Sequence, residues 1–311
     1  MKKILITGGA GYIGSILATK LVNLGHKVTV VDILKYNKNS IYHLFSKKNF
    51  NFIKADIRNS KLIKKLLSKN EIIIPLAGLV GAPLCERKKR EATTTNLNSI
   101  KDIVKYSGKK NKIIYLATNS GYGIGKKNKY CTEETTLRPI SHYGKTKCEA
   151  ENQVTKSHNY VSFRLATVFG ASYRMRTDLL VNNFCYMAVK KKKLKIFEPH
   201  FRRNFVHIND VVDCIIFAIN NFNKVRSNIY NLGLAKANIS KINLARKIKK
   251  IYRPLKIEIA VNRSDIDKRD YIVSNEKLKK RGFQAKISLE SGIKELINIF
   301  TLSDEKFINN Y

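Results

Sequence analysis

A glycine-rich segment near the N-terminus constrains the fold of this chain more than any other feature. The segment "ITGGAGYIGS" places Gly8, Gly11 and Gly14 between an apolar, strand-like run and a stretch of helical periodicity. Glycines at this spacing allow a tight turn from strand to helix and let the backbone approach a pyrophosphate. The N-terminus of the following helix attracts that anion through its free N–H groups and its dipole. The segment therefore predicts a dinucleotide-binding turn.

Carboxylates at the ends of the next two strand-like runs support this interpretation. Asp32 ends "KVTVVD", 18 residues after Gly14, and Asp56 follows in "KADIR". A carboxylate at the position of Asp32 can accept hydrogen bonds from both hydroxyls of an adenosine ribose and would repel a 2′-phosphate. Asp56 is expected to contact the adenine. The sequence therefore predicts NAD, rather than NADP, as the cofactor.

The first half of the chain alternates short β-rich runs with helical patterns. Several of the runs are apolar on both faces, which is typical of strands that helices cover on each side. This alternation predicts an α/β fold, a Rossmann-type doubly wound parallel sheet with right-handed crossovers. The predicted strands are 3–7, 27–32, 51–56, 71–77, 112–118 and 160–170.

Beyond residue 170 the pattern becomes irregular and indicates a second domain. We assign residues 1–170 to the NAD-binding domain and expect 204–233 to return to it. Residues 171–203 and 234–311 are predicted to form a smaller α/β substrate-binding domain. Its predicted helices lie near 178–193, 240–252 and 288–300.

The charge of the chain is strongly basic. Its 311 residues include 60 Lys and Arg against 23 Asp and Glu, a net charge of +37. Clustered cations can indicate a nucleic-acid binder. The basic runs here are scattered, favour Lys over Arg and lack interleaved aromatic residues. We therefore interpret most of the lysines as solvated surface that attracts anionic substrates in general, and we do not expect a nucleic-acid partner.

The spacing of the cysteines and the N-terminal sequence indicate the cellular compartment of the protein. The five cysteines have neither metal-ligand nor disulfide spacing, so we expect reduced thiols and no metal site. The apolar run after the first lysines is too short for a signal peptide, and no later run approaches the length of a membrane span. The sequence predicts a cytoplasmic protein without a membrane partner.

The stretch "RPISHYGKTKCEAE" sets Tyr143 and Lys147 four positions apart, on one face of a predicted helix. A tyrosine with a pKa of about 10 is ~0.1% ionised at pH 7, which is too little for a useful base. A nearby ammonium favours the phenolate, so Lys147 is expected to lower the pKa of Tyr143 while binding the nicotinamide ribose. Tyr143 could then take a proton from a substrate alcohol as a hydride leaves for NAD.

Taken in order, "TGGAGYIG", Asp32, "DIR", "ATNSGYG", "YGKTK" and "RRNFVHINDVV" resemble the extended short-chain dehydrogenase/reductase family. This family comprises NAD-dependent epimerases, dehydratases and dehydrogenases of sugar nucleotides. The resemblance implies that Thr118 completes the catalytic set with Tyr143 and Lys147, and it implies a homodimer formed through helices near 91–107 and 143–158. The implied cofactor-binding residues are Gly8, Gly11, Tyr12, Ile13, Gly14, Asp32, Asp56, Ile57, Leu76, Ala77, Tyr143 and Lys147.

Departures from the family pattern narrow the reaction. Dehydratases of the family follow the catalytic threonine with Asp-Glu, which cycle protons at C5 and C6, whereas this chain has Asn119-Ser120. Dehydration is therefore disfavoured, and oxidation at C4 remains. Segments such as "TNSGYGIG", "RMRTDLLVN" and "DKRDYIVSN" look most like bacterial GDP-manno-heptose 4-dehydrogenases of capsule synthesis.

A nucleotide-sugar substrate carries a diphosphate, which suits the planar fork of arginine. By resemblance Arg203 and Arg269 are the best candidates for diphosphate contacts. The full set of predicted substrate-binding residues is Asn119, Ser120, Arg176, Asn182, Arg203 and Arg269.

Three functions stay open at this point. The first is an NAD-dependent dehydrogenase that oxidises C4 of a GDP-heptose-like nucleotide sugar to a 4-keto sugar. The second is a 4-epimerase that uses the same residues on a UDP- or GDP-sugar and returns the hydride to the opposite face. The third, from another class, is a non-catalytic NAD-sensing or RNA-binding protein on the same fold, against which the Thr118, Tyr143 and Lys147 set argues.

Overall fold

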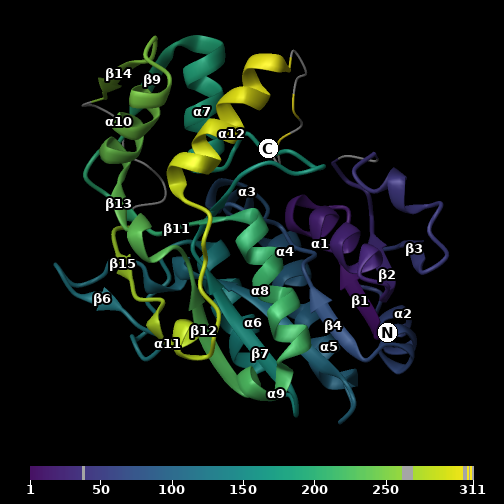
Figure 1. Cartoon of the computed structure of the whole chain (residues 1–311). Coiled ribbons are helices and arrows are strands. Elements are labelled where there is room, and N and C mark those ends of the chain that lie inside the picture. Colours follow the sequence, from purple (N-terminus) through teal and green to yellow (C-terminus); the bar gives the residue numbers. More distant parts are fainter. Residues whose placement is uncertain (37–38, 261–268, 304–306, 308, 310–311) are drawn as a thin grey trace.

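The structure is a computed structural model, and it describes residues 1–36, 39–260, 269–303, 307 and 309. Within these ranges seven parallel strands form a central sheet. They are β1 (Lys3–Thr7), β2 (Lys27–Asp32), β3 (Phe50–Lys54), β4 (Ile72–Pro75), β5 (Lys112–Thr118), β7 (Tyr160–Leu165) and β12 (Asn228–Leu232). Their order in the sheet is β12-β7-β5-β4-β1-β2-β3 (Figure 1). The predicted doubly wound parallel sheet is confirmed.

Helices cover both faces of this sheet, which explains the apolar runs. In β1, Ile4 and Ile6 pack toward α1 (Tyr12–Asn23) and α8 (Ile208–Asn220). Leu5 points to the opposite face, because successive strand residues alternate. That second face is covered by α2 (Ser60–Lys69), α5 (Ser99–Tyr106) and α6 (His142–Val154). Burial on both sides is what a fully apolar strand requires.

A second lobe lies above the carboxyl ends of the strands in Figure 1. It is built around α7 (Leu180–Lys191), α10 (Lys241–Ile251) and α12 (Leu289–Leu302), whose apolar faces share one buried cluster. Short parallel pairs complete it. These pairs are β9 (Lys193–Ile196) with β14 (Lys256–Ile259) and β8 (Thr167–Phe169) with β11 (Phe205–His207).

Residues 204–233 contribute one strand to the main sheet, one helix packed on α1 and one strand outside the main sheet. Strand β12 adds to β7 at the sheet edge, and α8 packs on α1. Strand β11 instead pairs with β8, beside the main sheet. The remaining elements are α3 (Ala82–Arg87), α4 (Lys89–Thr93), α9 (Phe222–Val225), α11 (Glu276–Lys280), β6 (Tyr130–Cys131), β10 (Arg202–Arg203), β13 (Ile239–Ser240), β15 (Ile272–Val273), η1 (Tyr42–Leu44), η2 (Thr94–Asn98), η3 (Asn119–Tyr122) and η4 (Ala235–Ala237).

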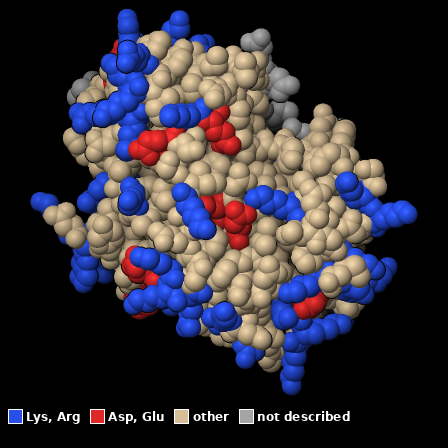
Figure 2. Space-filling view, in the orientation of Figure 1, with Lys and Arg blue, Asp and Glu red and all other residues tan. Residues whose placement is uncertain are grey.

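The strand order reverses between β1 and β4, which places a crevice at their carboxyl ends. In parallel α/β sheets, ligands bind at such a switch point. The surface around it carries basic side chains over both lobes, with acidic side chains among them, on the face shown in Figure 2. No helix in the described ranges is both long and apolar enough to span a membrane.

Candidate active site

A cavity of about 510 Å³ lies at the switch point, between the sheet and the second lobe. A smaller pocket of about 130 Å³ adjoins it and shares Gly8, Gly11 and Leu76 in its lining. All the predicted cofactor-binding residues line one or both of these spaces. The predicted substrate residues Ser120, Arg176, Arg203 and Arg269 line the larger one.

The turn that contains Gly8 and Gly14 forms an open cradle, which a side chain at either glycine position would fill. Gly8 has a φ of +72°, and a Cβ built on it would lie 2.5 Å from the backbone nitrogen of Ala77. A Cβ on Gly14 would lie 2.4 Å from the carbonyl oxygen of Gly8. Both positions therefore require glycine, and they leave the start of α1 open to the cavity. This cradle fits a dinucleotide pyrophosphate.

Asp32 closes the smaller pocket at the end of β2. Its carboxylate accepts hydrogen bonds from the backbone N–H groups of Ala10, at 3.0 Å, and Leu34, at 2.8 Å. Burial raises the pKa of Asp32, whereas these N–H donors and the positive charge of Arg174 lower it. Asp56 lies in the same pocket, where Arg58 Nε donates to its two oxygens at 3.0 and 2.9 Å.

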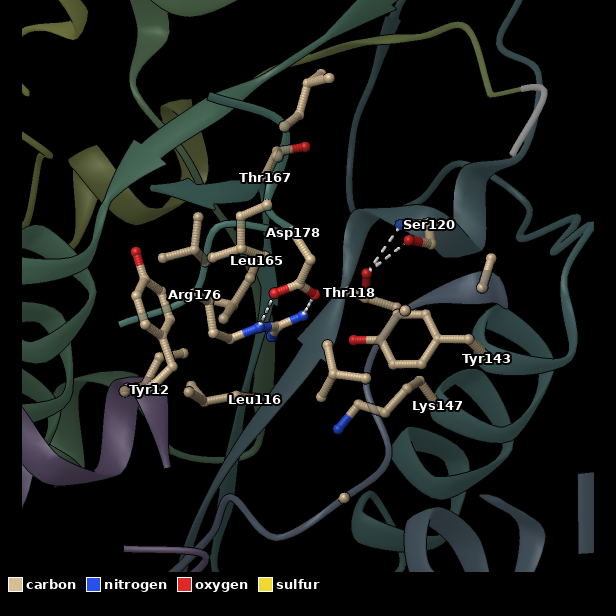
Figure 3. Close-up of a pocket in the computed structure, with 18 of the residues that line it drawn as sticks. Tyr12, Leu116, Thr118, Ser120, Tyr143, Lys147, Leu165, Thr167, Arg176 and Asp178 are labelled. Carbon is tan, nitrogen blue, oxygen red and sulfur yellow. Dashed lines mark hydrogen bonds and ion pairs between the residues drawn. The ribbon is translucent and has the colours of Figure 1, made fainter. Parts of the chain in front are cut away.

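Thr118, Tyr143 and Lys147 converge on the larger cavity from two elements (Figure 3). Helix α6 begins where the Ser141 side chain accepts a hydrogen bond from the Gly144 N–H, at 3.2 Å. Tyr143 and Lys147 share one face of this helix, and Thr118 ends β5 beside them. The Thr118 hydroxyl donates to Ser120 Oγ at 2.9 Å and accepts from the Ser120 N–H at 3.1 Å.

Burial dominates the protonation of Tyr143 and Lys147. Burial and the nearby Cys85 raise the pKa of Tyr143 to about 12, and the charges of Arg269 and Arg176 and the hydrogen bond with Thr118 act against this. Burial lowers the pKa of Lys147 to about 8. The charges of Arg269 and Arg176 thus favour the Tyr143 phenolate.

The second lobe contributes a wall of cations. Arg203, Arg269 and Lys241 line the cavity together. Arg269 donates a hydrogen bond to Ser120 Oγ, and so contacts the loop that follows Thr118. Arg202, beside Arg203, instead forms a two-pronged pair with Asp270 at 3.0 and 3.1 Å.

Two further features complete this wall, and the sequence did not indicate the second of them. Arg174 lines both spaces and stacks over the ring of Tyr36, with 4.8 Å between guanidinium carbon and ring centroid. Asp178 forms a buried ion pair with Arg176 inside the cavity (Figure 3). Among the described residues Asp178 is the single carboxylate that lines this cavity. An Arg-x-Asp spacing in a loop follows no periodic pattern that could have revealed the pair.

The structure places Asn182 and Asn119 outside the cavity lining, unlike the sequence prediction. Asn182 lies on the buried face of α7. Its side-chain oxygen accepts a hydrogen bond from the Gly170 N–H at 3.0 Å, and its side-chain nitrogen donates to the Arg176 carbonyl at 2.8 Å. The next residue, Asn183, lines the cavity. Asn119 is buried, and its amide has no hydrogen-bond partner in the described part of the chain.

Comparisons with known proteins agree with this geometry. The model of the "NAD dependent epimerase/dehydratase family" matches residues 4–233. Protein CapI of Staphylococcus aureus is 29% identical over 228 residues, covering 68% of each chain. A dTDP-D-glucose 4,6-dehydratase of Dictyostelium discoideum is 28% identical over 272 residues, which cover 80% of this chain and 62% of that protein, less than two thirds of its length. The solved structure of UDP-glucose 4-epimerase of Thermotoga maritima with UDP-glucose has a TM-score of 0.82 at 25% identity, covering 96% of this chain and 98% of that one.

Proposed function

The chain belongs to the NAD dependent epimerase/dehydratase family, its cofactor is NAD, and on this premise we propose that it oxidises the C4 hydroxyl of a nucleotide-activated sugar. The product is a 4-keto sugar, and a GDP-heptose-like substrate is favoured. The observation that carries the proposal is the meeting of Thr118, Tyr143 and Lys147 in one cavity (Figure 3), which Arg203 and Arg269 also line.

Each residue of the site has a separate role in the proposed oxidation. Tyr143 takes the proton of the C4 hydroxyl, and Thr118 holds that hydroxyl and the phenol oxygen in line. NAD, when bound, accepts the hydride from the same carbon. Lys147 binds the nicotinamide ribose, while Asp32 binds the adenosine ribose. Arg203 and Arg269 hold the substrate diphosphate, so that C4 is presented to Tyr143.

The cations also make Tyr143 a better base. Arg269 and Arg176 oppose the effect of burial on the pKa of Tyr143. A diphosphate bound to Arg269 would offset part of that charge. Asp178 holds the Arg176 guanidinium in place, and its carboxylate offsets part of the Arg176 charge in the same way.

Dehydration is the disfavoured outcome. It needs an acid and a base beside C5 and C6, and Asn119 and Ser120 stand where dehydratases of the family carry carboxylates. Asp178 is the single acidic side chain in the described lining of the cavity, and it is already paired with Arg176. A paired carboxylate at hydrogen-bond distance from a guanidinium is a poor general acid.

The second candidate is a 4-epimerase. It is supported by the overlap of this chain, over 96% of its length, with a solved UDP-glucose 4-epimerase. Epimerisation would use the same proton and hydride transfers, followed by rotation of the keto sugar and return of the hydride.

One incubation separates these outcomes. Purified protein with added NAD is incubated with GDP-heptose, GDP-mannose and UDP-glucose, and absorbance at 340 nm and the mass of the sugar are followed. Accumulated NADH with a product two hydrogens lighter supports the dehydrogenase. An inverted sugar without net NADH supports the epimerase, and a product lighter by one water would establish dehydration and overturn the proposal. Tyr143→Phe is the matched control.

The surface of the molecule bears on two further kinds of partner, a second copy of the chain and a nucleic acid. The packed helices α5 and α6 are the face through which we propose a homodimer, to be tested by light scattering. The spread of basic side chains in Figure 2, with acidic ones among them, gives no single track for a nucleic-acid backbone on the face shown.

A further inference from the structure

The surroundings of Lys147 contain two side chains that no sequence motif assigned. Lys147 Nζ lies 4.2 Å from the ring centroid of Tyr115, on β5 beneath α6. Glu151 follows Lys147 by one helical turn on α6, so the two side chains share a face of that helix. Both Tyr115 and Glu151 are buried, with 0% and 1% of their surfaces exposed.

The other titratable groups that face Lys147 are neutral where it titrates. They are Tyr143 and Cys148 on α6 and Cys85 on α3. Burial raises the pKa of Tyr143, Cys148 and Cys85 to about 12 in each case. Glu151 is therefore the one carboxylate in this group, and it opposes the effect of burial on the pKa of Lys147.

Glu151 is itself fixed from the neighbouring strand. Its carboxylate accepts hydrogen bonds from Ser162 Oγ at 2.7 Å and from Arg164 Nε at 2.9 Å, both on β7. The Arg164 guanidinium also reaches Tyr122 Oη, at 3.2 Å, and the carbonyl of Glu133, at 3.0 Å. These bonds hold the Glu151 carboxylate in place.

We propose that Tyr115 and Glu151 are positioning residues that keep Lys147 protonated at the point where it contacts the cofactor. The face of an aromatic ring attracts a desolvated cation, and a nearby carboxylate does the same. Without them, burial alone would favour the neutral amine. The proposal rests on the proposed role of Lys147 in binding the nicotinamide ribose.

The Tyr115 hydroxyl offers a matched pair of variants. It is buried, and it has no hydrogen-bond partner in the described part of the chain. Tyr115→Phe removes only this hydroxyl and keeps the ring, so it should leave Lys147 unchanged. Tyr115→Leu removes the ring and should lower the pH at which Lys147 loses its proton by about one pH unit.

The test is the affinity for NAD as a function of pH, measured by calorimetry without substrate. A folded-state Lys147 is charged below its pKa, which burial lowers to about 8, so NAD binding should weaken as the pH rises through this region. Tyr115→Leu should bind NAD like the wild type at pH 6.5 and weaken earlier on raising the pH, whereas Tyr115→Phe should follow the wild type throughout. Equal midpoints for Tyr115→Leu and the wild type, or equal shifts in both variants, would overturn the role of the ring.

Further variants test the carboxylate and the assignment itself. Glu151→Gln should also lower the midpoint. Because it leaves Arg164 buried without its partner, the double change Glu151→Gln/Arg164→Met is measured beside it. An unchanged midpoint in both would overturn the role of Glu151. Lys147→Met should abolish the weakening of NAD binding as the pH rises through about 8, and a weakening that persists in this variant would overturn the whole assignment. Since no sugar is involved, failure of these tests is distinct from failure to turn over a nucleotide sugar.

Discussion

Tyr143 is the residue whose protonation should set the rate of the proposed oxidation. Because its pKa is about 12, the phenolate fraction rises tenfold with each pH unit across the neutral range. Burial lowers the pKa of Lys147 to about 8, so its proposed contribution to cofactor binding should weaken above that pH. We predict that kcat/KM with a turned-over nucleotide sugar rises with pH and levels off above about pH 8, because the loss of the Lys147 charge there offsets the gain in phenolate. A profile that is flat from pH 6 to pH 9 would contradict this account.

Thr118 should matter to the rate and not to the cofactor. The Thr118 hydroxyl lowers the pKa of the Tyr143 phenol, and Thr118→Val removes this hydroxyl with little change in volume. We predict a fall in kcat of about 10²-fold, the usual size of a lost acid–base partner, and an unchanged Kd for NAD. A parallel loss of NAD affinity would instead indicate a structural role.

Asp32 should control the choice of dinucleotide. Asp32→Asn removes the charge that repels a 2′-phosphate, so we predict weaker binding of NAD and stronger binding of NADP, measured by calorimetry. Because burial raises the pKa of Asp32, its carboxylate protonates at a higher pH than an ordinary aspartate. NAD affinity should therefore fall on mild acidification, and this fall should be absent from the variant. Retained NAD preference in Asp32→Asn would contradict the assignment.

At the scale of single residues, the sequence motifs identified Thr118, Tyr143 and Lys147. Which other side chains reach the cavity, and how burial changes their pKa values, depends on the packing of the folded chain. Thr118, Tyr143 and Lys147 stand in recognisable patterns, and all of them line the cavity. Asn182 does not, because one residue along a helix turns a side chain by about 100°, and Asn183 faces the cavity in its place. The effect of burial on the pKa of Tyr143 could not be predicted, because it depends on side chains such as Cys85, far away in the sequence.

At the scale of elements, the turn between β1 and α1 gives the sharpest prediction. Gly8→Ala places a Cβ 2.5 Å from the Ala77 backbone at a φ of +72°, so we predict lost NAD binding and a destabilisation of more than about 1 kcal/mol. Gly25→Ala is the control, because Gly25 has a φ of +79° with no atom within 4 Å of the added Cβ. It should cost about 1 kcal/mol in the free energy of unfolding and leave NAD binding intact. Equal NAD affinity in Gly8→Ala and Gly25→Ala would refute the proposal that the glycine turn holds the pyrophosphate of NAD.

Strands that form continuous apolar runs were predicted well. The runs 3–7, 27–32 and 112–118 match β1, β2 and β5, because each is apolar on both faces and ends at a polar or turn residue. The run 160–170 is instead divided into β7 and β8, which join different sheets. The strands of the pair β10 with β13 have two residues each and are too short to show a period.

At the scale of the whole molecule, the net charge of +37 should speed the capture of anionic ligands. Salt screens such a field over about 10 Å at 0.1 M. We predict that KM for the nucleotide sugar rises several-fold between about 20 mM and about 300 mM salt, while kcat at saturation stays constant. A KM that does not respond to salt would show that local contacts, such as those of Arg203 and Arg269, act alone.

The central claim is that a hydride leaves C4 of a nucleotide sugar for NAD beside Tyr143. The direct measurement uses a GDP-heptose that carries deuterium at C4 and analyses the reduced cofactor by mass spectrometry. The account predicts NADH that carries the deuterium, a slower turnover with the labelled substrate, and no labelled NADH from Tyr143→Phe. Consumption of the sugar with unlabelled cofactor, or with deuterium lost to water, would contradict it.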